Sequence, residues 1–245
     1  MCKKIILIIL SLSIVKLEEI NFLSASPFSF RDIILYLDEQ EKQEVYGILK
    51  FPKNDSKKKY PLIIGIAGSL GWQEHHREAL QMYREMGIAT FELHSFQSRG
   101  VDSTVGEQIK VTTAMLILDS YKALDVLSAH SKIDKNNIAI TGWSLGGGTT
   151  LLSGWLPLIN AINPANRFAA HLAYYPPCVV EPTELSFSDA PIHILIGEDD
   201  DWTPASACIS LVEAAKKIRK NIDITVFEDS HHSFDSNLGI ANIEN

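Results

Sequence analysis

The chain has 245 residues, of which 46% are apolar and 21% are charged. This composition is typical of a globular protein and excludes a disordered or fibrous chain, and the length suits one domain with a substantial core. Lysine and arginine number 22 against 30 aspartate and glutamate, so the formal net charge is −8 and binding to nucleic acid phosphates is not expected.

The first 25 residues have the pattern of an export signal. Two lysines precede an apolar stretch from Ile5 to Val15, and small residues follow around Ala25. The stretch is too short to span a bilayer, which takes about 20 residues. We therefore expect residues 1–25 to be a signal peptide and residues 26–245 to form a single exported domain, periplasmic or secreted, without a stable membrane span. The alternative is an amphipathic helix packed on a cytoplasmic domain.

Apolar runs then alternate with helical patterns, which predicts an α/β fold with a mostly parallel central sheet. We expect an antiparallel hairpin from Arg31 to Leu37 and Gln43 to Phe51 at its N-terminal end. Unbroken apolar runs indicate strands buried on both faces, and hence helices on both sides of the sheet. The further strands are expected at Leu62–Ala67, Ile88–Leu93, Ile138–Thr141, Phe168–Tyr174, Ile192–Ile196 and Ile222–Phe227, and the helices at Glu74–Met86, Glu107–His130, Leu145–Trp155 and Ala205–Lys220.

A candidate nucleophile lies between a predicted strand and a predicted helix. Gly142-Trp143-Ser144-Leu145-Gly146 matches the G-x-S-x-G pattern of a nucleophile elbow. Glycine at the two flanking positions removes the Cβ atoms that would collide in so sharp a turn. Ser144 is therefore the predicted nucleophile.

A serine nucleophile needs a base, and the base needs an orienting acid. In an elbow-type hydrolase the order along the chain is Ser, then Asp or Glu, then His. Here the acids of Glu198-Asp199-Asp200-Asp201 follow one predicted strand, and His231 and His232 follow the next. Each candidate therefore falls at the carboxyl end of its own strand, where reactive groups of parallel sheets gather.

The oxyanion of the reaction needs two inward-pointing N–H donors. One is expected from Leu145, directly after the nucleophile at the start of its helix. The second is expected from the loop Gly68-Ser69-Leu70-Gly71, with Ser69 as first choice and Gly68 as second.

These motifs together resemble the dienelactone hydrolase family of α/β-hydrolases, from about Arg31 to Asp235. The resemblance implies the α/β-hydrolase fold. It selects Asp200 as the acid, because Asp200 is the third residue after a strand-ending glycine and lies four residues before Pro204. It selects His232 as the base, because His232 directly precedes a small residue and Phe234. It is carried by the glycine-rich loop after the first central strand, His94-Ser95-Phe96-Gln97-Ser98-Arg99-Gly100, the elbow, Tyr174-Tyr175-Pro176, Gly197-Glu198-Asp199-Asp200-Asp201-Trp202-Thr203-Pro204 and His232-Ser233-Phe234-Asp235.

Three features depart from the family pattern. The best-known members have cysteine at the elbow, so with Ser144 the chain resembles the serine-type esterase branch instead. Ala67 and His94 stand where many relatives have histidine and aspartate. Only 13 residues follow His232, where relatives usually add a helix, so a truncated C-terminus is one interpretation.

Several other side chains have two interpretations each. Arg99 either binds a substrate carboxylate or braces its own loop through backbone carbonyls. Trp143 and Trp202 either line the substrate pocket or pack in the core. Cys178 and Cys208, the cysteines left after removal of a signal peptide, are expected to form a disulfide, with two free thiols as the alternative. No metal site is expected, because the histidines near residue 75 have no third ligand at a useful spacing.

The sequence thus predicts a serine hydrolase that cleaves carboxylic esters or lactones through an acyl-enzyme, with no cofactor. Ser144, His232 and Asp200 are the expected triad. An acyltransferase with the same intermediate and a non-catalytic binding protein on a hydrolase fold are the alternatives. The physiological substrate and the oligomeric state do not follow from these patterns.

Overall fold

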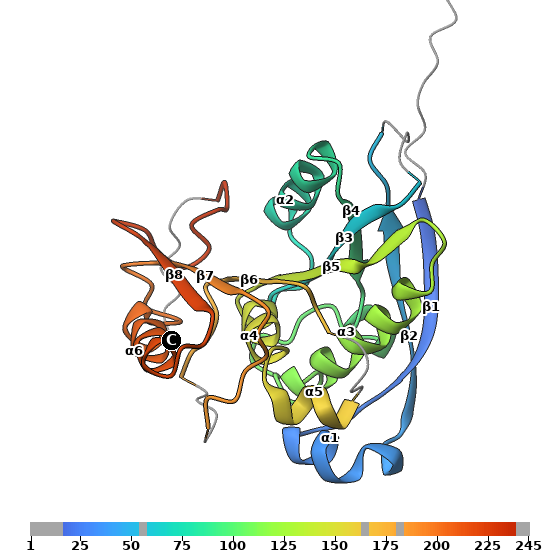
Figure 1. Ribbon diagram of the computed structural model, residues 1–245, viewed down its shortest axis with the longest axis horizontal. Helices are drawn as coiled ribbons and strands as arrows, with labels where there is room; N and C mark the ends of the chain where they lie inside the picture. The colour runs from blue at the N-terminus through green and yellow to red at the C-terminus, as the bar shows by residue number, and fades with distance from the viewer. Residues whose placement is uncertain (1–16, 54–57, 163–166, 180–183, 239–245) are drawn as a thin grey trace, which may run out of the picture.

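A computed structural model describes residues 17–53, 58–162, 167–179 and 184–238 (Figure 1). These residues contain an eight-stranded sheet of order β1-β2-β4-β3-β5-β6-β7-β8. Pairing is antiparallel between β1 and β2 and between β2 and β4, and parallel from β4 to β8. The strands are β1 Leu17–Ala25, β2 Lys42–Lys50, β3 Tyr60–Ile66, β4 Ala89–Leu93, β5 Ile133–Trp143, β6 His171–Tyr174, β7 Ile192–Gly197 and β8 Ile222–Phe227.

The helices join these strands as an α/β-hydrolase fold requires. They are α1 Phe30–Tyr36, α2 Glu74–Glu85, α3 Thr113–Ser128, α4 Leu145–Leu152, α5 Leu156–Ile162 and α6 Ala205–Lys217. The predicted α/β fold, mostly parallel with an antiparallel N-terminal hairpin, is therefore confirmed. None of the helices in the described ranges has the length and apolarity to cross a membrane.

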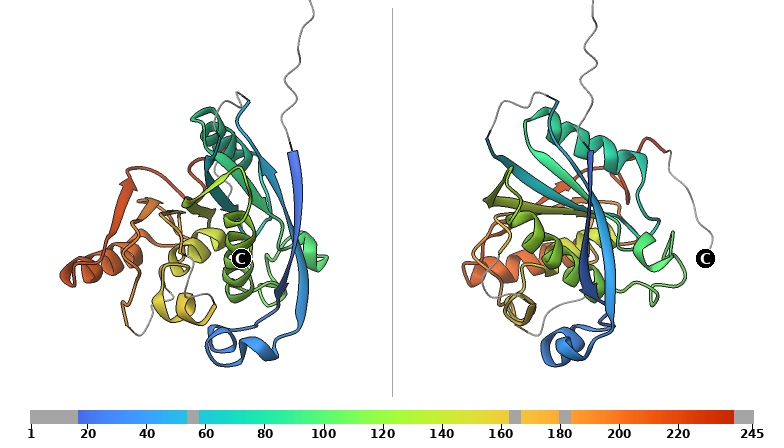
Figure 2. Two further views of the ribbon diagram at one scale, coloured as in Figure 1. Left: turned by 45° about the vertical axis from the view of Figure 1, so that its right-hand side comes forward. Right: turned by 90° about the vertical axis from the view of Figure 1, so that its right-hand side faces the viewer.

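The position of the N-terminal hairpin differs from the prediction. The segment predicted as a strand from Arg31 to Leu37 is helix α1, because Ser29 and Asp32 form a reciprocal capping box that starts a helix there. The antiparallel partner of β2 is instead β1, which pairs with it over nine residues at the edge of the sheet (Figure 2). Strand β1 lies inside the range predicted as a signal peptide, whereas the apolar stretch Ile5–Val15 lies outside the described residues.

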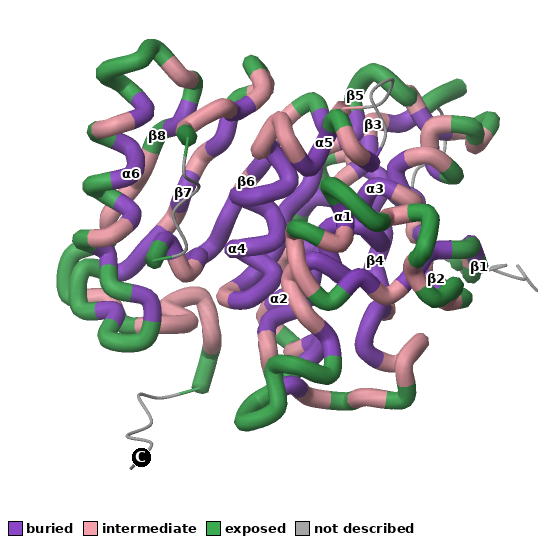
Figure 3. The backbone as a smooth tube through the Cα atoms, turned by 90° about the horizontal axis from the view of Figure 1, so that it is seen from below, coloured by how far each residue is buried: buried purple, intermediate pink, exposed green. Residues whose placement is uncertain are grey.

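Helices lie on both faces of the sheet, but they cover the two faces unequally. Helices α3, α4 and α6 lie on one side and α2 on the other (Figure 1). Helix α4 and strand β6 are almost wholly buried, while α6 exposes its outer side (Figure 3). Both α4 and β6 contact β5, whose buried carboxyl end leads directly into Ser144.

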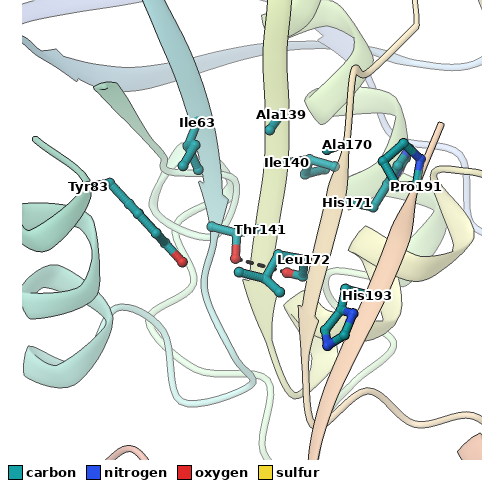
Figure 4. A pocket seen from close by; sticks show the side chains of 10 residues that line it. All are labelled: Ile63, Tyr83, Ala139, Ile140, Thr141, Ala170, His171, Leu172, Pro191 and His193. Carbon is teal, nitrogen blue, oxygen red and sulfur yellow. Dashed lines mark hydrogen bonds between the residues drawn. The ribbon is translucent and has the colours of Figure 1, made fainter. Parts of the chain in front are cut away.

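On the α2 side, part of the sheet over β6 and β7 has no covering helix among the described residues. An open, largely apolar cavity of about 290 Å³ lies there, lined by Tyr83, Thr141, Leu172 and His193 among others (Figure 4). The run Ile192–Ile196 predicts a strand covered on both faces, but on the α2 side this strand is covered only in part. The polar residue within that run, His193, belongs to the less covered face and bonds to Thr225 Oγ1 at 2.8 Å.

Candidate active site

The turn between β5 and α4 holds Ser144 in a conformation that few residues adopt. Its φ is 54° and its ψ −113°. A Cβ on Gly142 would lie 2.2 Å from the carbonyl oxygen of Gly146, and a Cβ on Gly146 would lie 2.3 Å from that of Ile66. Only glycine fits at these two positions, because any side chain would collide with a carbonyl oxygen. The close packing allows the sharp, strained turn that places Ser144 at the carboxyl edge of the sheet.

His232 lies beside Ser144, although 88 residues separate them in the sequence. His232 Nε2 is 3.0 Å from Ser144 Oγ, and His232 Nδ1 is 2.8 Å from Asp200 Oδ2. The structure therefore brings together the three residues that the sequence predicted as a triad. The neighbouring His231 is exposed, with its Nδ1 3.1 Å from the carbonyl oxygen of Asp199.

The carboxylate of Asp200 is buried and hydrogen-bonded on both oxygens. Oδ1 accepts from the backbone N–H of Trp202 at 3.0 Å and of Thr203 at 2.8 Å, and Oδ2 lies 2.8 Å from Thr203 Oγ1. Burial alone would raise the pKa of Asp200, but the hydrogen bonds from His232 and Thr203 outweigh it and hold the pKa below its ordinary value. Asp200 is therefore ionised at neutral pH, whereas Asp201 next to it is exposed.

The loop after β3 passes close to the elbow. A Cβ on Gly68 would lie 3.2 Å from the carbonyl oxygen of Trp143 and 3.6 Å from Cβ of Ser144. The carbonyl oxygen of Ser69 accepts from the N–H of Thr104 at 2.8 Å and from Ser103 Oγ at 3.1 Å. Among the described residues the N–H groups of Gly68, Ser69 and Leu70 have no acceptor. This loop is thus held against Ser144 with the N–H groups of Gly68 and Ser69, the two candidates from the sequence, both unused.

Arg99 has no donor left for a substrate. Its guanidinium is 7% exposed and forms two bonds to the carboxylate of Asp119, at 2.7 and 3.2 Å. Its other N–H groups donate to the carbonyl oxygens of Ala25 and Ser95 and to Ser26 Oγ. All five donors of the guanidinium are used. The geometry matches the bracing interpretation and contradicts its assignment as a substrate-binding residue.

The two tryptophans have different environments. Trp143 is fully buried and stacks on Tyr174 and His76, so the core-packing interpretation describes it and it does not line a pocket. Trp202 is 55% exposed and stacks on the ring of His232 with centroids 5.6 Å apart. Trp202 therefore lies on the solvent-exposed side of the His232 ring.

Three residues near the triad occur in the motifs quoted above, but the sequence assigns them no role. Thr203 bonds to Asp200, and the ring edge of Tyr175 contacts the ring of His232 with centroids 4.7 Å apart. Asp235 bonds to both Trp143 and Tyr175. The Asp-x-x-Thr spacing is a local signal that could have indicated Thr203, but the partners of Asp235 are distant in sequence and leave no local pattern.

The predicted disulfide between Cys178 and Cys208 is present, with the two Cα atoms 5.0 Å apart. It joins the segment after β6 to helix α6, which begins just after the loop of Asp200. No group of three histidine, cysteine, aspartate or glutamate side chains within the described ranges is arranged to hold a metal ion.

The fold and this arrangement are those of an α/β-hydrolase. A model of the dienelactone hydrolase family matches residues 49–242, and the chain belongs to that family. No curated protein matches the sequence. The family assignment makes the protein a hydrolase.

Solved structures share the fold at low sequence identity. A Klebsiella pneumoniae protein described as a dienelactone hydrolase is 19% identical, with a TM-score of 0.61 and coverage of 89% of this chain and 88% of that one. Esterase Est2 of Thermogutta terrifontis is 18% identical, with a TM-score of 0.61 and coverage of 78% and 79%, and has also been solved with propionate bound and phosphorylated by paraoxon. Est1E of Butyrivibrio proteoclasticus is 17% identical, with a TM-score of 0.58 and coverage of 79% and 88%.

Proposed function

We propose that this protein is a serine esterase that cleaves carboxylic esters or lactones through an acyl-enzyme. The observation that carries the proposal is the continuous chain of contacts from Ser144 Oγ to His232 Nε2 at 3.0 Å and from His232 Nδ1 to Asp200 Oδ2 at 2.8 Å. This chain starts from a serine in a strained strand-to-helix turn. Family membership supports the same reaction class.

In the first half of the reaction Ser144 Oγ attacks the ester carbonyl carbon while His232 Nε2 takes the hydroxyl proton. Asp200 accepts the Nδ1–H of His232, which fixes the tautomer and stabilises the imidazolium that forms. The imidazolium then donates its proton to the departing alkoxide, so an alcohol leaves and the acyl group stays on Oγ. In the second half a water molecule replaces the serine hydroxyl in the same steps, and a carboxylic acid is released.

The negative charge on the former carbonyl oxygen needs donors that are already in place. The N–H of Leu145 is the first of helix α4, where helical N–H groups have no acceptor within the helix. The unused N–H of Ser69 is the proposed second donor, because its loop is fixed directly beside Ser144. Trp202, exposed over the ring of His232, is proposed to line the entrance for the substrate.

The test is hydrolysis of p-nitrophenyl esters of graded acyl length, beginning with acetate and propionate, together with labelling by a fluorophosphonate. Ser144→Ala and His232→Ala should each lower kcat by several orders of magnitude in a folded protein. Asp200→Asn should cost less, because the nucleophile remains. Matched controls are His231→Ala and Asp201→Asn, which should stay within roughly tenfold of the parent. A folded parent that neither hydrolyses these esters nor reacts with the probe would refute the proposal.

We further propose that the protein is exported and that any processing takes place before Leu17. Strand β1 begins there, and cleavage near Ala25 would remove a strand paired over nine residues. The disulfide supports an oxidising compartment. Intact-mass measurement of the protein from its native host tests this, and a mature N-terminus after residue 1 and no later than residue 17 is expected. The full chain retained in the cytoplasm would contradict export, and an N-terminus at residue 26 would contradict the proposed position of processing.

A further inference from the structure

The carboxylate of Asp235 joins three segments that meet at the site. Asp235 Oδ2 accepts from Trp143 Nε1 at 2.9 Å, and Oδ1 accepts from the hydroxyl of Tyr175 at 2.9 Å. Trp143 directly precedes Ser144 at the end of β5, Tyr175 follows β6, and Asp235 lies in the loop after β8, three residues beyond His232. One side chain therefore connects the loop of the base to the backbone turn of the nucleophile.

The shape of this loop lets both His232 and Asp235 reach the site. Ser233 has a φ of 60°, and its carbonyl oxygen accepts from the N–H of Ser236 at 2.9 Å, so the chain turns sharply after His232. The ring of Phe234 packs against Phe227, with centroids 4.7 Å apart. The turn presents His232 to the nucleophile and Asp235 to the elbow, so a shift of one would displace the other.

Both side chains that bind Asp235 are hydrogen-bond donors. Burial, followed by the nearby charge of Asp235, raises the pKa of Tyr175, which therefore stays a neutral donor. His75 Nε2 lies 4.0 Å from Asp235 Oδ1 and has no hydrogen-bond partner in the described part of the chain. Burial lowers the pKa of His75, although Asp235 and Glu78 oppose this. At this distance His75 forms no hydrogen bond to the carboxylate, so Trp143 and Tyr175 are the side chains that hold Asp235 among the described residues.

The geometry points to Asp235 as a positioning residue, which sets the distance between His232 Nε2 and Ser144 Oγ by fastening the base loop to Trp143 and Tyr175. This inference rests on the proposed esterase function. Asp235 does not touch the reacting atoms. It is also separate from the acid of the triad, because among the described carboxylates it is Asp200 that contacts Nδ1 of His232. The expected consequence is an effect on the chemical step, since a misplacement of about 1 Å can cost roughly a hundredfold in rate.

The test compares Asp235→Asn with Asp229→Asn, which removes the same charge from an exposed position of the same loop. Asp229 has a φ of 51°, a conformation that asparagine tolerates. Ile33→Val, a buried change in α1, controls for a general loss of stability. All measurements are made well below the melting temperature of each variant, on p-nitrophenyl acetate and on fluorophosphonate labelling of Ser144.

Asp235→Asn should lower kcat and the labelling rate by roughly tenfold to a hundredfold with KM within about twofold, while both controls keep the parental kcat. Tyr175→Phe, which keeps the ring against His232 and removes one donor, should give a smaller loss that is not additive with Asp235→Asn, because both changes break the same bond. If Asp235→Asn does not fold, Tyr175→Phe carries the test alone.

Suppose the parent is active and labelled, but Asp235→Asn, or Tyr175→Phe if Asp235→Asn does not fold, has the same kcat as the controls. That result would overturn the positioning role and leave the esterase proposal intact. A loss confined to KM would overturn it as well, since it would indicate a contact with the substrate. A parent that is folded but neither active nor labelled marks the failure of the esterase proposal, and the positioning role falls with it.

Discussion

The disulfide offers a stability prediction whose magnitude follows from the chain itself. Cys178 and Cys208 are 30 positions apart. In the chain-entropy description, closing a loop of about 30 residues removes enough freedom from the unfolded chain to stabilise the fold by about 3.6 kcal/mol at 25 °C. In a domain of this size, 1 kcal/mol corresponds to roughly 2 to 4 °C in melting temperature, so reduction should lower it by about 7 to 14 °C.

The assay is thermal and urea unfolding of the protein with and without reductant, beside a Cys178→Ala/Cys208→Ala double variant. The double variant should unfold like the reduced parent and should not respond to reductant. Thiol titration of the denatured, unreduced protein should find no free thiol, or one where Cys2 is retained. Two or more free thiols, or a reduced protein within about 1 kcal/mol of the oxidised one, would refute the reasoning.

Two further predictions concern buried ionisable side chains. Burial lowers the pKa of His171 to about 4 from the ordinary 6.5, so the unfolded chain binds more protons than the folded one between these pH values. The free energy of unfolding should therefore fall by about 3 kcal/mol as the pH drops from 6.5 to 4. Urea titrations at several pH values should show a flatter dependence of this free energy on pH for His171→Gln, and equal dependences would contradict the assignment. Arg99→Ala leaves the buried carboxylate of Asp119 without its ion-pair partner and should lower the free energy of unfolding by about 3 to 5 kcal/mol, with partial recovery in Arg99→Ala/Asp119→Ala. A stable Arg99→Ala variant with a raised KM for acidic esters would instead restore the substrate-binding interpretation.

The candidate triad could be found from the sequence because each member carries a local signal. Ser144 lies in a glycine-flanked turn between a strand and a helix, and the acid and base follow strands in the order that an elbow-type hydrolase requires. The role of Arg99 stayed open for the opposite reason. Its partners include Ala25 and Asp119, 74 and 20 positions away, and only the folded chain shows that they occupy every donor.

The N-terminal region shows how two sequence patterns can compete. In Leu17–Ala25 more and less exposed residues alternate from the start of the strand, as expected for a sheet edge, but the small residues at its end also suit a cleavage zone. From Phe30 to Tyr36 the residues Ile-Ile-Leu-Tyr favour a strand by propensity, while Ser29 and Asp32 cap a helix. The cap prevails because helix α1 packs on α5 rather than pairing with the sheet edge, a contact that local propensity does not reveal.

The bracing of β1 by Arg99 also bears on the order of events during synthesis. The end of β1 is bound by the guanidinium of Arg99, which is itself held by Asp119, and Asp119 leaves the ribosome 94 residues after Ala25. At about 5 to 20 residues per second, this interval lasts roughly 5 to 20 s. Throughout it the first strand lacks the ion pair that later fixes it. The export proposed above would therefore have this interval for recognition of the nascent chain, before Arg99 and Asp119 hold the end of β1.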